Sequence, residues 1–433
     1  MRSPVLKFYR SLASSILKPL IESRIFPNFS QRTLIFENPP TEKHSKRIWF
    51  HASSVGELEM LIPIIEKREE EVILTVFSES AERPLQKLAA RLNQCLEKAQ
   101  TKATATGFGP KVLFAGYCPW EGEWKTAFGL YQPDLFVSAR YEAWPELWAS
   151  LGELKIPLTI VGSQLRTSLL VAKNIVNFMS VDLPPLEFLS IEESEVASLQ
   201  KEFPSAKVSA AGDPRWDRVA ERAKLGNPRA KQLIEQFAQC ERPWGVLGSA
   251  WVEDLSMLGK SVFELPGTLW VVPHEVDAEH IREFEDWLKS HEISFVKTSN
   301  LKENDTSAKP RCLLVDEMGF LSELYSAADW AYVGGGFGKG VHNTIEPAIH
   351  GIPIFCGSAR IHRFPEVKYL QDVGQLIVLM SMEDVPKLRD VVTRGHYQST
   401  KSVWKESAHR QLGASERISK RISETLSGTL KDI

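Results

Sequence analysis

Short β-rich runs alternate with helical stretches along almost the whole 433-residue chain. Alternation of this kind predicts a doubly wound parallel sheet, and two successive sets of strands predict two α/β domains. The first set comprises Arg47–Ser53, Glu71–Phe77, Lys111–Phe114, Leu135–Ala139, Leu158–Gly162, Phe188–Ile191 and a strand ending near Ala211. The second set comprises Trp244–Gly248, Thr268–Val272, Cys312–Val315, Trp330–Val333 and Ile352–Phe355.

The length also favours two domains, because one hydrophobic core rarely serves a chain of this size. We expect an amphipathic segment at 1–32, a first domain at 33–225 and a second domain at 226–405. The remaining residues, 406–433, contain a polar stretch, Glu406–Leu426, that predicts one terminal helix. This helix is expected to pack back on the first domain.

Composition excludes several classes of protein. The net charge of −3 gives no electrostatic reason to expect a nucleic-acid partner. Five scattered cysteines without a CxxC spacing favour reduced thiols over disulfides or zinc ligands. The GxxxxGK[ST], HExxH and GxSxG motifs do not occur, which argues against phosphate-loop NTPases, zinc hydrolases and serine hydrolases. No two aspartates are separated by one residue, so no metal site for a nucleotide-diphosphate sugar is predicted.

The first 32 residues are strongly basic, with Glu22 as their single acid. Their apolar residues recur at roughly helical spacing, and the sequence contains no apolar run of 18 residues that would span a bilayer. A basic amphipathic helix lies either on an anionic membrane surface or against the core of its own protein. The sequence leaves both interpretations open.

The stretch Trp330–Pro347 predicts a buried strand, a glycine loop containing Gly335 and Gly336, and a helix at Thr344–His350. Backbone N–H groups and the positive end of a helix dipole at such a junction suit a phosphate. Lys339 and His342 can add positive charge or donors, and Glu346 could accept from a ribose hydroxyl. The alternative is a capping pair of Asn343 and Glu346 beside an ordinary tight turn.

Ligands of doubly wound sheets lie outside the carboxyl ends of the strands, so polar residues there become candidates. Glu57 follows the first strand, and a carboxylate at this place could act as a general base. Ser54 and Glu57 also have the spacing of a capping box, which is the alternative role. Gly56 weakens that alternative, since glycine costs helix stability but permits a partner to approach closely.

Two further strand ends carry charged residues in the first domain. Arg140 and Glu142 follow Leu135–Ala139, and they either hold a polar substrate or form a buried ion pair. Arg215 lies near the predicted boundary between the domains, where it either meets an anion or pairs with Asp217.

Four consecutive strand ends of the second domain are polar or rich in glycine, which indicates a nucleotide pocket rather than ordinary turns. Besides the glycine loop, the candidates are Ser249, Pro273, His274, Met318, Gly319 and Phe320.

Seven motifs stand in a fixed order: Ser54–Glu57, Glu142–Pro145, Gly212–Asp217, Gly248–Trp251, Pro273–Glu275, Met318–Gly319 and His342–Pro347. Over nearly the whole chain this set resembles the Kdo transferases, which attach 3-deoxy-D-manno-oct-2-ulosonic acid (Kdo) to the lipid A precursor. The resemblance implies an inverting GT-B glycosyltransferase with two Rossmann-like domains facing across a cleft, and with neither metal nor cofactor. It also implies CMP-Kdo as donor and lipid IVA as acceptor, at the cytoplasmic face of the inner membrane.

The resemblance assigns roles to residues. Glu57 matches the base that deprotonates the acceptor hydroxyl, Arg215 matches a position that stabilises developing negative charge, and Glu142 falls in an acidic-Trp-Pro motif. Ser54, Gly56 and Arg140 are expected on the acceptor side. The donor side comprises Ser249, Pro273, His274, Met318, Gly319, Phe320, Gly335, Gly336, Lys339, His342, Asn343, Thr344, Ile345 and Glu346.

The chain departs from its relatives at three places. Arg140 stands where many relatives have an acid, His274 stands where they commonly have Arg, and Gly162–Gln164 replaces an Asn-Ala-Arg-like segment. The first departure puts a second acidic role in doubt, and the second weakens a phosphate contact unless His274 is protonated. Three alternatives therefore stay open: a GT-B transferase using a UDP-sugar, a nucleotide-sugar epimerase, and an inactive lipid-binding homologue.

Overall fold

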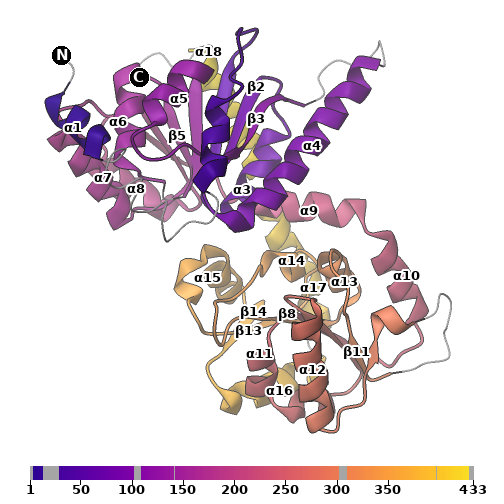
Figure 1. The fold of residues 1–433 in the computed structure, drawn as a ribbon. Coiled ribbons are helices and arrows are strands. Elements are labelled where there is room, and N and C mark those ends of the chain that lie inside the picture. Colours follow the sequence, from indigo (N-terminus) through magenta and orange to yellow (C-terminus); the bar gives the residue numbers. More distant parts are fainter. Residues whose placement is uncertain are drawn as a thin grey trace. The chain divides into compact units, whose positions relative to one another are not determined.

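The computed structural model describes residues 3–12, 29–101, 109–140, 142–301, 310–395 and 397–428. By its internal contacts the chain divides into two units (Figure 1). Unit 1 comprises Met1–Arg218 and Leu412–Ile433, and unit 2 comprises Val219–Gln411. Each unit is built on one seven-stranded sheet, and every strand pairing in the described residues is parallel.

The sheet of unit 1 has the order β3-β2-β1-β4-β5-β6-β7. Its central strands are continuous buried runs, as expected for parallel strands covered by helices on both faces. The strands are β1 (Arg47–Ala52), β2 (Glu71–Val76), β3 (Lys111–Tyr117), β4 (Leu135–Ala139), β5 (Leu158–Ser163), β6 (Leu186–Ser190) and β7 (Lys207–Ala210). The helices are α1 (Pro4–Leu12), α3 (Val55–Ile65), α4 (Glu79–Thr101), α5 (Trp124–Tyr131), α6 (Pro145–Leu154), α7 (Thr167–Phe178), α8 (Val196–Glu202) and α18 (Ala414–Ser427), with 3₁₀ turns η2 (Phe29–Phe36) and η3 (Glu193–Glu195). Helix α9 (Arg215–Leu225) begins in unit 1, and its residues from Val219 on belong to unit 2.

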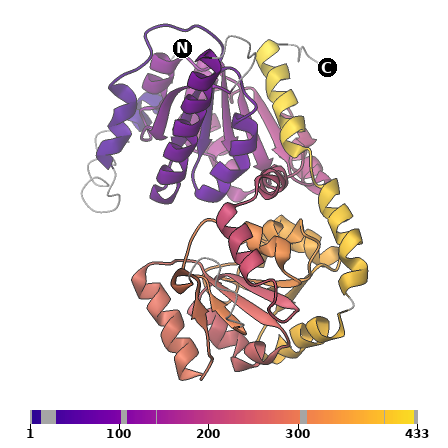
Figure 2. The same ribbon diagram turned by 90° about the vertical axis from the view of Figure 1, so that its right-hand side faces the viewer.

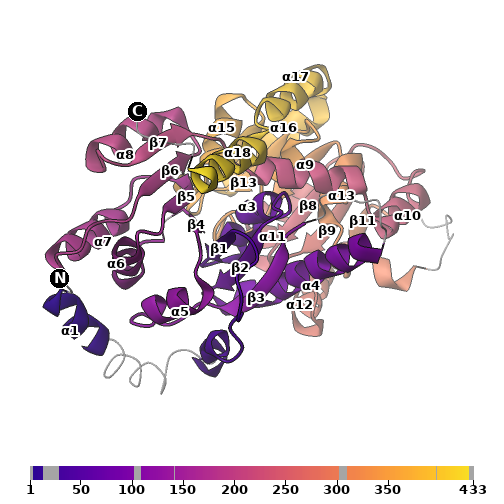
Figure 3. The same cartoon turned by 90° about the horizontal axis from the view of Figure 1, so that it is seen from above.

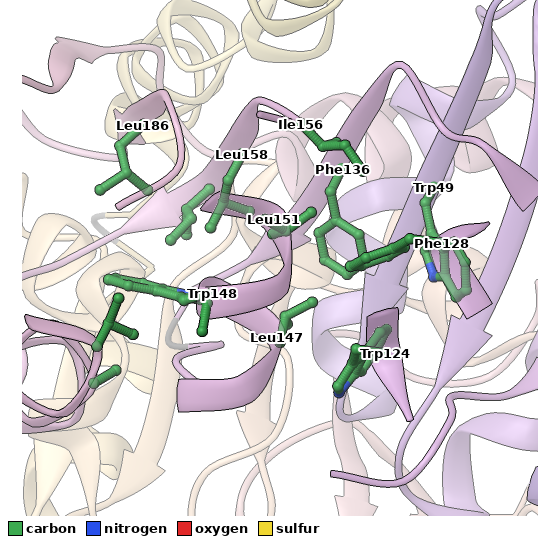
Figure 4. Packing of buried hydrophobic residues seen from close by; sticks show 14 of the residues in the cluster. Trp49, Trp124, Phe128, Phe136, Leu147, Trp148, Leu151, Ile156, Leu158 and Leu186 are labelled. Atoms are coloured by element: carbon green, nitrogen blue, oxygen red, sulfur yellow. The ribbon is translucent and has the colours of Figure 1, made fainter. Parts of the chain in front are cut away.

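Two hydrophobic layers cover this sheet. One layer packs α5, α6, α7 and α8 against one face, and the other packs α3, α4 and α18 against the opposite face (Figure 3). Figure 4 shows the first layer, in which Trp124 and Phe128 of α5 lie against Trp49 and Phe136 of the sheet. Ring centroids there are 5.2–6.0 Å apart, the range of favourable aromatic pairs.

The C-terminal segment returns to unit 1, where α18 packs on α3 (Figure 2). Asp217 accepts hydrogen bonds from the backbone N–H groups of Gly413 and Ser415, both at 2.6 Å, and so fixes the start of α18. The single terminal helix predicted at Glu406–Leu426 is wrong. The chain instead forms α17 (Tyr397–Arg410) and α18, because Gly413 has a φ of 87° and ends helical geometry between them.

The sheet of unit 2 has the order β10-β11-β9-β8-β12-β13-β14. Its strands are β8 (Trp244–Ala250), β9 (Thr268–Pro273), β10 (Val296–Lys297), β11 (Cys312–Leu314), β12 (Trp330–Val333), β13 (Ile354–Gly357) and β14 (Leu376–Leu379). The helices are α10 (Pro228–Gln236), α11 (Val252–Leu258), α12 (Ala278–Ser290), α13 (Leu321–Ala327), α14 (Ile345–Ala348), α15 (Pro365–Asp372), α16 (Val385–Arg394) and α17, with 3₁₀ turns η4 (Lys260–Glu264), η5 (Thr298–Asn300), η6 (Ile361–Arg363) and η7 (Met382–Asp384). The expected strand list lacked β10, which has only two residues, and β14.

The N-terminal segment is described only in part, since residues 13–28 of the predicted amphipathic helix lie outside the described residues. Within α1, Leu6 is buried in the layer of α5 to α8. Arg10 forms ion pairs with Glu146 at 2.7 Å and Glu153 at 2.8 Å, and Tyr9 donates to Glu121 at 3.1 Å. The inner face of α1 therefore packs on its own protein. Among the described residues, no helix is long and apolar enough to cross a membrane.

Both sheets reverse their strand order next to their first strand. In unit 1 the reversal lies between β1 and β4, and in unit 2 it lies between β8 and β12. Such switch points open a crevice outside the carboxyl ends of the two neighbouring strands, where doubly wound proteins bind their ligands. Glu57 follows β1 and Glu142 follows β4, while Ser249 is the last residue but one of β8 and the glycine loop follows β12.

Candidate active site

In unit 1, the turn between β1 and α3 holds Glu57 by its carboxylate. The Oε2 atom of Glu57 accepts from the backbone N–H groups of Ser53 at 2.7 Å and Ser54 at 3.1 Å. In return, the Ser54 hydroxyl accepts from the N–H of Glu57 at 3.4 Å. This is the capping box that the sequence allowed, so the capping interaction and a catalytic role concern the same side chain.

The second carboxylate oxygen of Glu57, Oε1, accepts no hydrogen bond from any residue that the structure describes. Burial raises the pKa of Glu57 to about 7, and the neighbouring charge of Glu142 adds to the rise. The N–H groups of Ser53 and Ser54 and the charge of Arg140 oppose it. A fixed carboxyl group with a pKa near neutrality is suited to take up a proton from a hydroxyl.

Glu142 lies buried beyond β4, beside Glu57. Its Oε2 atom accepts from Trp144 Nε1 at 2.7 Å and lies 3.6 Å from Nε2 of His51. Burial by itself would raise the pKa of Glu142, but His51, the Ser53 hydroxyl and Trp144 together lower it below its ordinary value. Glu142 thus stays charged at the pH where Glu57 takes up a proton, and the ion pair with Arg140 that the sequence allowed is not the main contact of Glu142.

Two predicted residues of unit 1 differ in what the backbone requires of them. Arg140 has a φ of 61°, a left-handed conformation that costs energy for a residue with a side chain. Gly56 is exposed in the first turn of α3, and a Cβ atom added there would meet nothing within 4 Å. The fold therefore does not require glycine at position 56.

Arg215 begins α9, and its guanidinium forms an ion pair with Asp213, with Nη2 at 2.5 Å from Oδ2. The pair with Asp217 that the sequence allowed is wrong, because Asp217 fixes the start of α18. Asp213 is buried and accepts from both Nε and Nη2 of Arg215, which orients the guanidinium.

In unit 2, the glycine loop is held mainly by its own backbone. The N–H of Gly335 donates to Asp254 at 2.8 Å, and those of Gly338 and Gly340 donate to the carbonyl of Gly335. A Cβ atom on Gly336 would lie 2.4 Å from the backbone nitrogen of Gly357 at the end of β13. Close packing thus accounts for these glycines, and the N–H of Gly335 is already engaged instead of meeting a phosphate.

The helix after the glycine loop is shorter than predicted. It comprises only Ile345–Ala348, so it supplies little of the dipole expected from Thr344–His350. The side chain of Asn343 accepts from the N–H of Ile345 at 3.0 Å and lies 3.5 Å from Glu346. Asn343 thus accepts from one N–H at the start of the helix, but the capping pair with Glu346 is not formed as expected, because the N-cap is the buried Thr344, whose side chain accepts no capping hydrogen bond.

A cluster of rings and one ammonium group lies at the ends of β8, β9 and β12. The rings of His274 and His342 stack with centroids 4.0 Å apart, and Trp251 Nε1 donates to His342 Nε2 at 3.0 Å. The Nζ atom of Lys339 lies 3.2 Å from the centroid of the Trp251 ring, a cation–π contact. Trp251 closes the motif Gly248–Trp251, but only the fold brings its ring to this cluster.

Both histidines of this cluster are neutral at pH 7. Burial lowers the pKa of His342 to about 4, helped by His274 and Lys339, and burial also lowers the pKa of His274. Of the two roles that the sequence allowed for His342, positive charge or a donor, the lowered pKa leaves the donor. Because His342 Nε2 accepts from Trp251, its proton sits on Nδ1 and makes this atom a neutral donor. Lys339 carries the charge of the cluster.

The remaining donor-side candidates are dispersed. Ser249 has a φ of 49° at the end of β8, and Pro273 is the buried last residue of β9. Met318 is exposed, and the carbonyl of Gly319 accepts from Arg222. Phe320 is buried in the core beside α10 and α13, which points to a packing role.

One group of side chains in the described residues has the spacing of metal ligands: Glu275, Asp277 and His280, after β9. The ring nitrogens of His280 lie 2.6 Å from Asp277 and 3.0 Å from Glu275. Asp277 raises the pKa of His280, and the group is an exposed cluster of polar side chains centred on the His280 ring.

Comparison with known proteins extends these observations. Residues 27–218 match the family model of 3-deoxy-D-manno-octulosonic-acid transferase (kdotransferase). Kdo transferases from Chlamydophila psittaci and Aquifex aeolicus are 24% and 25% identical over 80% and 72% of this chain, and 75% of each relative is covered. A bifunctional glycosyltransferase/methyltransferase from Fusobacterium nucleatum is 21% identical over 82% of the chain, which spans only 52% of that protein.

Solved structures with the same architecture include two enzymes of different activity. UDP-GlcNAc 2-epimerase from Neisseria meningitidis has a TM-score of 0.55 at 14% identity, covering 88% of this chain and 100% of its own. The glycotransferase of kitacinnamycin has a TM-score of 0.50 at 12% identity, covering 89% of this chain and 100% of its own. At these identities the likeness shows the fold alone. It confirms the predicted GT-B class of two parallel α/β units.

Proposed function

Because the chain belongs to the Kdo transferase family of glycosyltransferases, we propose that it transfers Kdo from CMP-Kdo to lipid IVA with inversion and without a metal. The observation that supports this proposal most is the setting of the Glu57 carboxyl group. Its Oε2 atom is fixed by two backbone N–H groups, its Oε1 atom is open, and its pKa is about 7. In an inverting transfer, such a group removes the proton of the acceptor hydroxyl as that oxygen attacks the anomeric carbon.

The chemistry at the donor follows from its single phosphate. When the bond between the anomeric carbon and the phosphate oxygen breaks, negative charge grows on CMP. Arg215 is the group proposed to stabilise this growing charge without a metal, while Lys339 and the Nδ1–H donor of His342 are proposed to bind the phosphate that CMP-Kdo already carries. The pairing of Arg215 with Asp213 supports a fixed orientation of the guanidinium rather than a freely mobile charge.

Binding at the cytoplasmic face of the inner membrane is part of the proposal, since lipid IVA is a membrane lipid. Exposed apolar side chains lie on three helices of unit 1: Val5 and Phe8 on α1, Leu154 on α6, and Val171 and Phe178 on α7. Contacts join α1 to α6 and α6 to α7, and the three helices lie side by side in Figures 1 and 3. We call this surface the apolar helix face. It supports peripheral contact with a bilayer through the outer side of α1, while Leu6 and Arg10 hold its inner side.

Mass spectrometry of lipid IVA incubated with the protein and CMP-Kdo tests the proposal directly. The expected product is heavier by one or more Kdo residues, and formation should persist in excess EDTA. A panel of UDP-sugars, including UDP-GlcNAc, belongs in the same experiment. A sugar transferred only from a UDP donor would contradict CMP-Kdo as donor, and epimerisation without transfer would indicate an epimerase. Activity that disappears in EDTA and returns with Mg²⁺ would contradict the metal-free reaction, and Asp277→Ala would then test the cluster after β9.

A further inference from the structure

Three polar side chains are buried side by side in the sheet of unit 1, on strands β1, β2 and β4. The candidate base, Glu57, lies after β1. Thr75 of β2, His51 of β1 and Ser138 of β4 are partners in register, and all three are at most 1% exposed. Partners in register on parallel strands point to the same face of a sheet. The ring of His51 lies among apolar rings, 5.8 Å from Trp124 and 6.2 Å from Phe136 between centroids. A polar group buried in such surroundings needs a partner.

The contacts on both sides of the His51 ring decide together which ring nitrogen carries hydrogen. Its Nδ1 atom lies 3.0 Å from the hydroxyl of Thr75, which accepts from Trp49 Nε1 at 2.8 Å. The single hydrogen of this hydroxyl points either to Nδ1 or to the carbonyl of Phe50 at 3.4 Å, so the contact at Nε2 decides. The Nε2 atom of His51 lies 3.6 Å from the Glu142 carboxylate and has no hydrogen-bond partner among the described residues. A lone pair on Nε2 would repel that carboxylate. In the neutral ring with Thr75 donating to Nδ1, and equally in the imidazolium, Nε2 carries a hydrogen that faces Glu142.

The groups around the two glutamates come from several elements. Arg140, after β4, acts on Glu57, and Trp144 and the Ser53 hydroxyl donate to Glu142. Cys118, after β3, also lies near Glu142, but burial raises the pKa of its thiol to about 12 and it stays neutral. Arg32 donates to Cys118 and to the carbonyl of Phe77, and it adds positive charge on that side. Of the groups in this set, His51 alone belongs to a strand of the sheet, since it lies in β1.

We propose that His51 is a positioning residue for the transfer reaction: its Nε2–H holds Glu142 as a carboxylate, so that Glu57 becomes the proton acceptor of the pair. This inference rests on the proposed function in one respect, namely that Glu57 is the base. When two carboxyl groups share a site, the one whose negative charge is better stabilised ionises first, and the other ionises at higher pH. In this proposal, His51 makes Glu142 the carboxyl group that ionises first. The Thr75 hydroxyl donates to Nδ1 of His51, so the hydrogen of the neutral ring sits on Nε2.

Two substitutions at one position separate this role from simple packing. The amide nitrogen of glutamine reaches about the place of histidine Nε2, whereas that of asparagine reaches about the place of Nδ1. His51→Gln therefore keeps a donor toward Glu142, and His51→Asn removes it. Ser138→Ala is the matched control, because Ser138 is equally buried next to His51 and its hydroxyl has no hydrogen-bond partner in the described part of the chain.

The first measurement is the titration of the two glutamate side chains by NMR of carboxyl-¹³C-labelled protein, assigned with Glu57→Gln. In His51→Asn, the apparent pKa of Glu142 should rise and that of Glu57 should fall, each by about one unit. His51→Gln and Ser138→Ala should titrate like the original protein. Titrations that are identical in all three variants would overturn the proposal. If His51→Asn does not fold, Thr75→Val, which frees Nδ1, should shift both values in the same directions.

The second measurement is the pH dependence of kcat/KM. Its acid limb, expected near pH 7, should move down by about one unit in His51→Asn and stay in place in His51→Gln. Together, the two measurements test the role of His51 separately from the role of Glu57 as the base. Carboxyl titrations that shift as expected while the acid limb does not move would leave the role of His51 intact and would contradict Glu57 as the base. An acid limb that shifts equally in His51→Gln and His51→Asn would assign His51 to packing alone.

Discussion

The two switch points carry opposite kinds of groups, although the sheets around them have closely similar orders. The switch point of unit 1 brings together two buried carboxyl groups, Glu57 and Glu142, whose pKa values are displaced in opposite directions. The switch point of unit 2 carries one ammonium group, Lys339, on a cluster of neutral rings. The switch point of unit 1 thus holds a carboxyl group suited to accept a proton, and that of unit 2 holds a cation, which fits the proposed transfer from a phosphate donor.

The largest effect is expected when Glu57, the proposed proton acceptor of unit 1, is replaced. Glu57→Gln should lower kcat by roughly 10²–10⁴-fold while CMP affinity stays unchanged, because the base belongs to unit 1 alone. CMP affinity is measured by calorimetry and kcat by product formation. Glutamine can still accept from Ser53 and Ser54, so the cap is kept. A variant with the original rate would reduce Glu57 to its capping role.

The same variant gives a stability test whose sign follows from the pKa. Because the pKa of Glu57 is raised from 4.5 to about 7 on folding, the folded protein binds the extra proton between these values. Its stability therefore decreases as pH rises through that window. Glu57→Gln lacks this loss, so its Tm relative to the original protein should increase from about pH 4.5 to pH 7 and stay constant above. A difference in Tm that is independent of pH would contradict the raised pKa.

The next largest effect concerns the charge of unit 2. Lys339→Ala should raise KM for CMP-Kdo roughly 10- to 100-fold with little change in kcat, because a contact between an ammonium group and a phosphate contributes about 1.5–3 kcal/mol. Lys231→Ala, which removes an exposed lysine of α10 in the same unit, is the control. KM and kcat are measured by steady-state kinetics at varied concentrations of CMP-Kdo. A lower kcat at unchanged KM in Lys339→Ala would move this residue from ground-state binding to transition-state stabilisation.

A smaller effect is expected for vesicle binding, which is proposed to use the apolar helix face of unit 1. Phe8→Ser on the apolar helix face should weaken co-sedimentation with anionic vesicles several-fold, since it removes 69%-exposed aromatic surface. Leu225→Ser, at 84% exposure in unit 2, should leave binding unchanged. Equal loss in both variants would argue against this face. Arg10 is unsuitable for such a test, because its ion pairs with Glu146 and Glu153 hold α1 in place.

Sequence patterns predicted the central strands closely, because buried parallel strands are continuous apolar runs. They failed where an element depends on tertiary contacts: β10 has two residues, and the terminal helix breaks at a glycine that only backbone geometry reveals. At the site, motif position alone indicated Glu57 and Glu142. Spacing could not show that Asp254 accepts a hydrogen bond from the N–H of Gly335, since these residues are distant in sequence. Nor could it show that burial keeps His342 neutral.

The smallest expected effect is also the most specific for the acceptor side of unit 1. Gly56→Ala should stabilise α3 by about 0.5–1 kcal/mol, because alanine restricts the unfolded chain and its Cβ atom meets nothing within 4 Å. Gly129→Ala in α5 is the matched control, with an equally open Cβ position. Thermal unfolding should show a similar gain in both. If the lipid acceptor approaches the backbone at Gly56, only Gly56→Ala should lower kcat/KM for lipid IVA, by several-fold. Full activity in both variants would place the acceptor away from the first turn of α3 and would leave Glu57 to reach it through its Oε1 atom from another side.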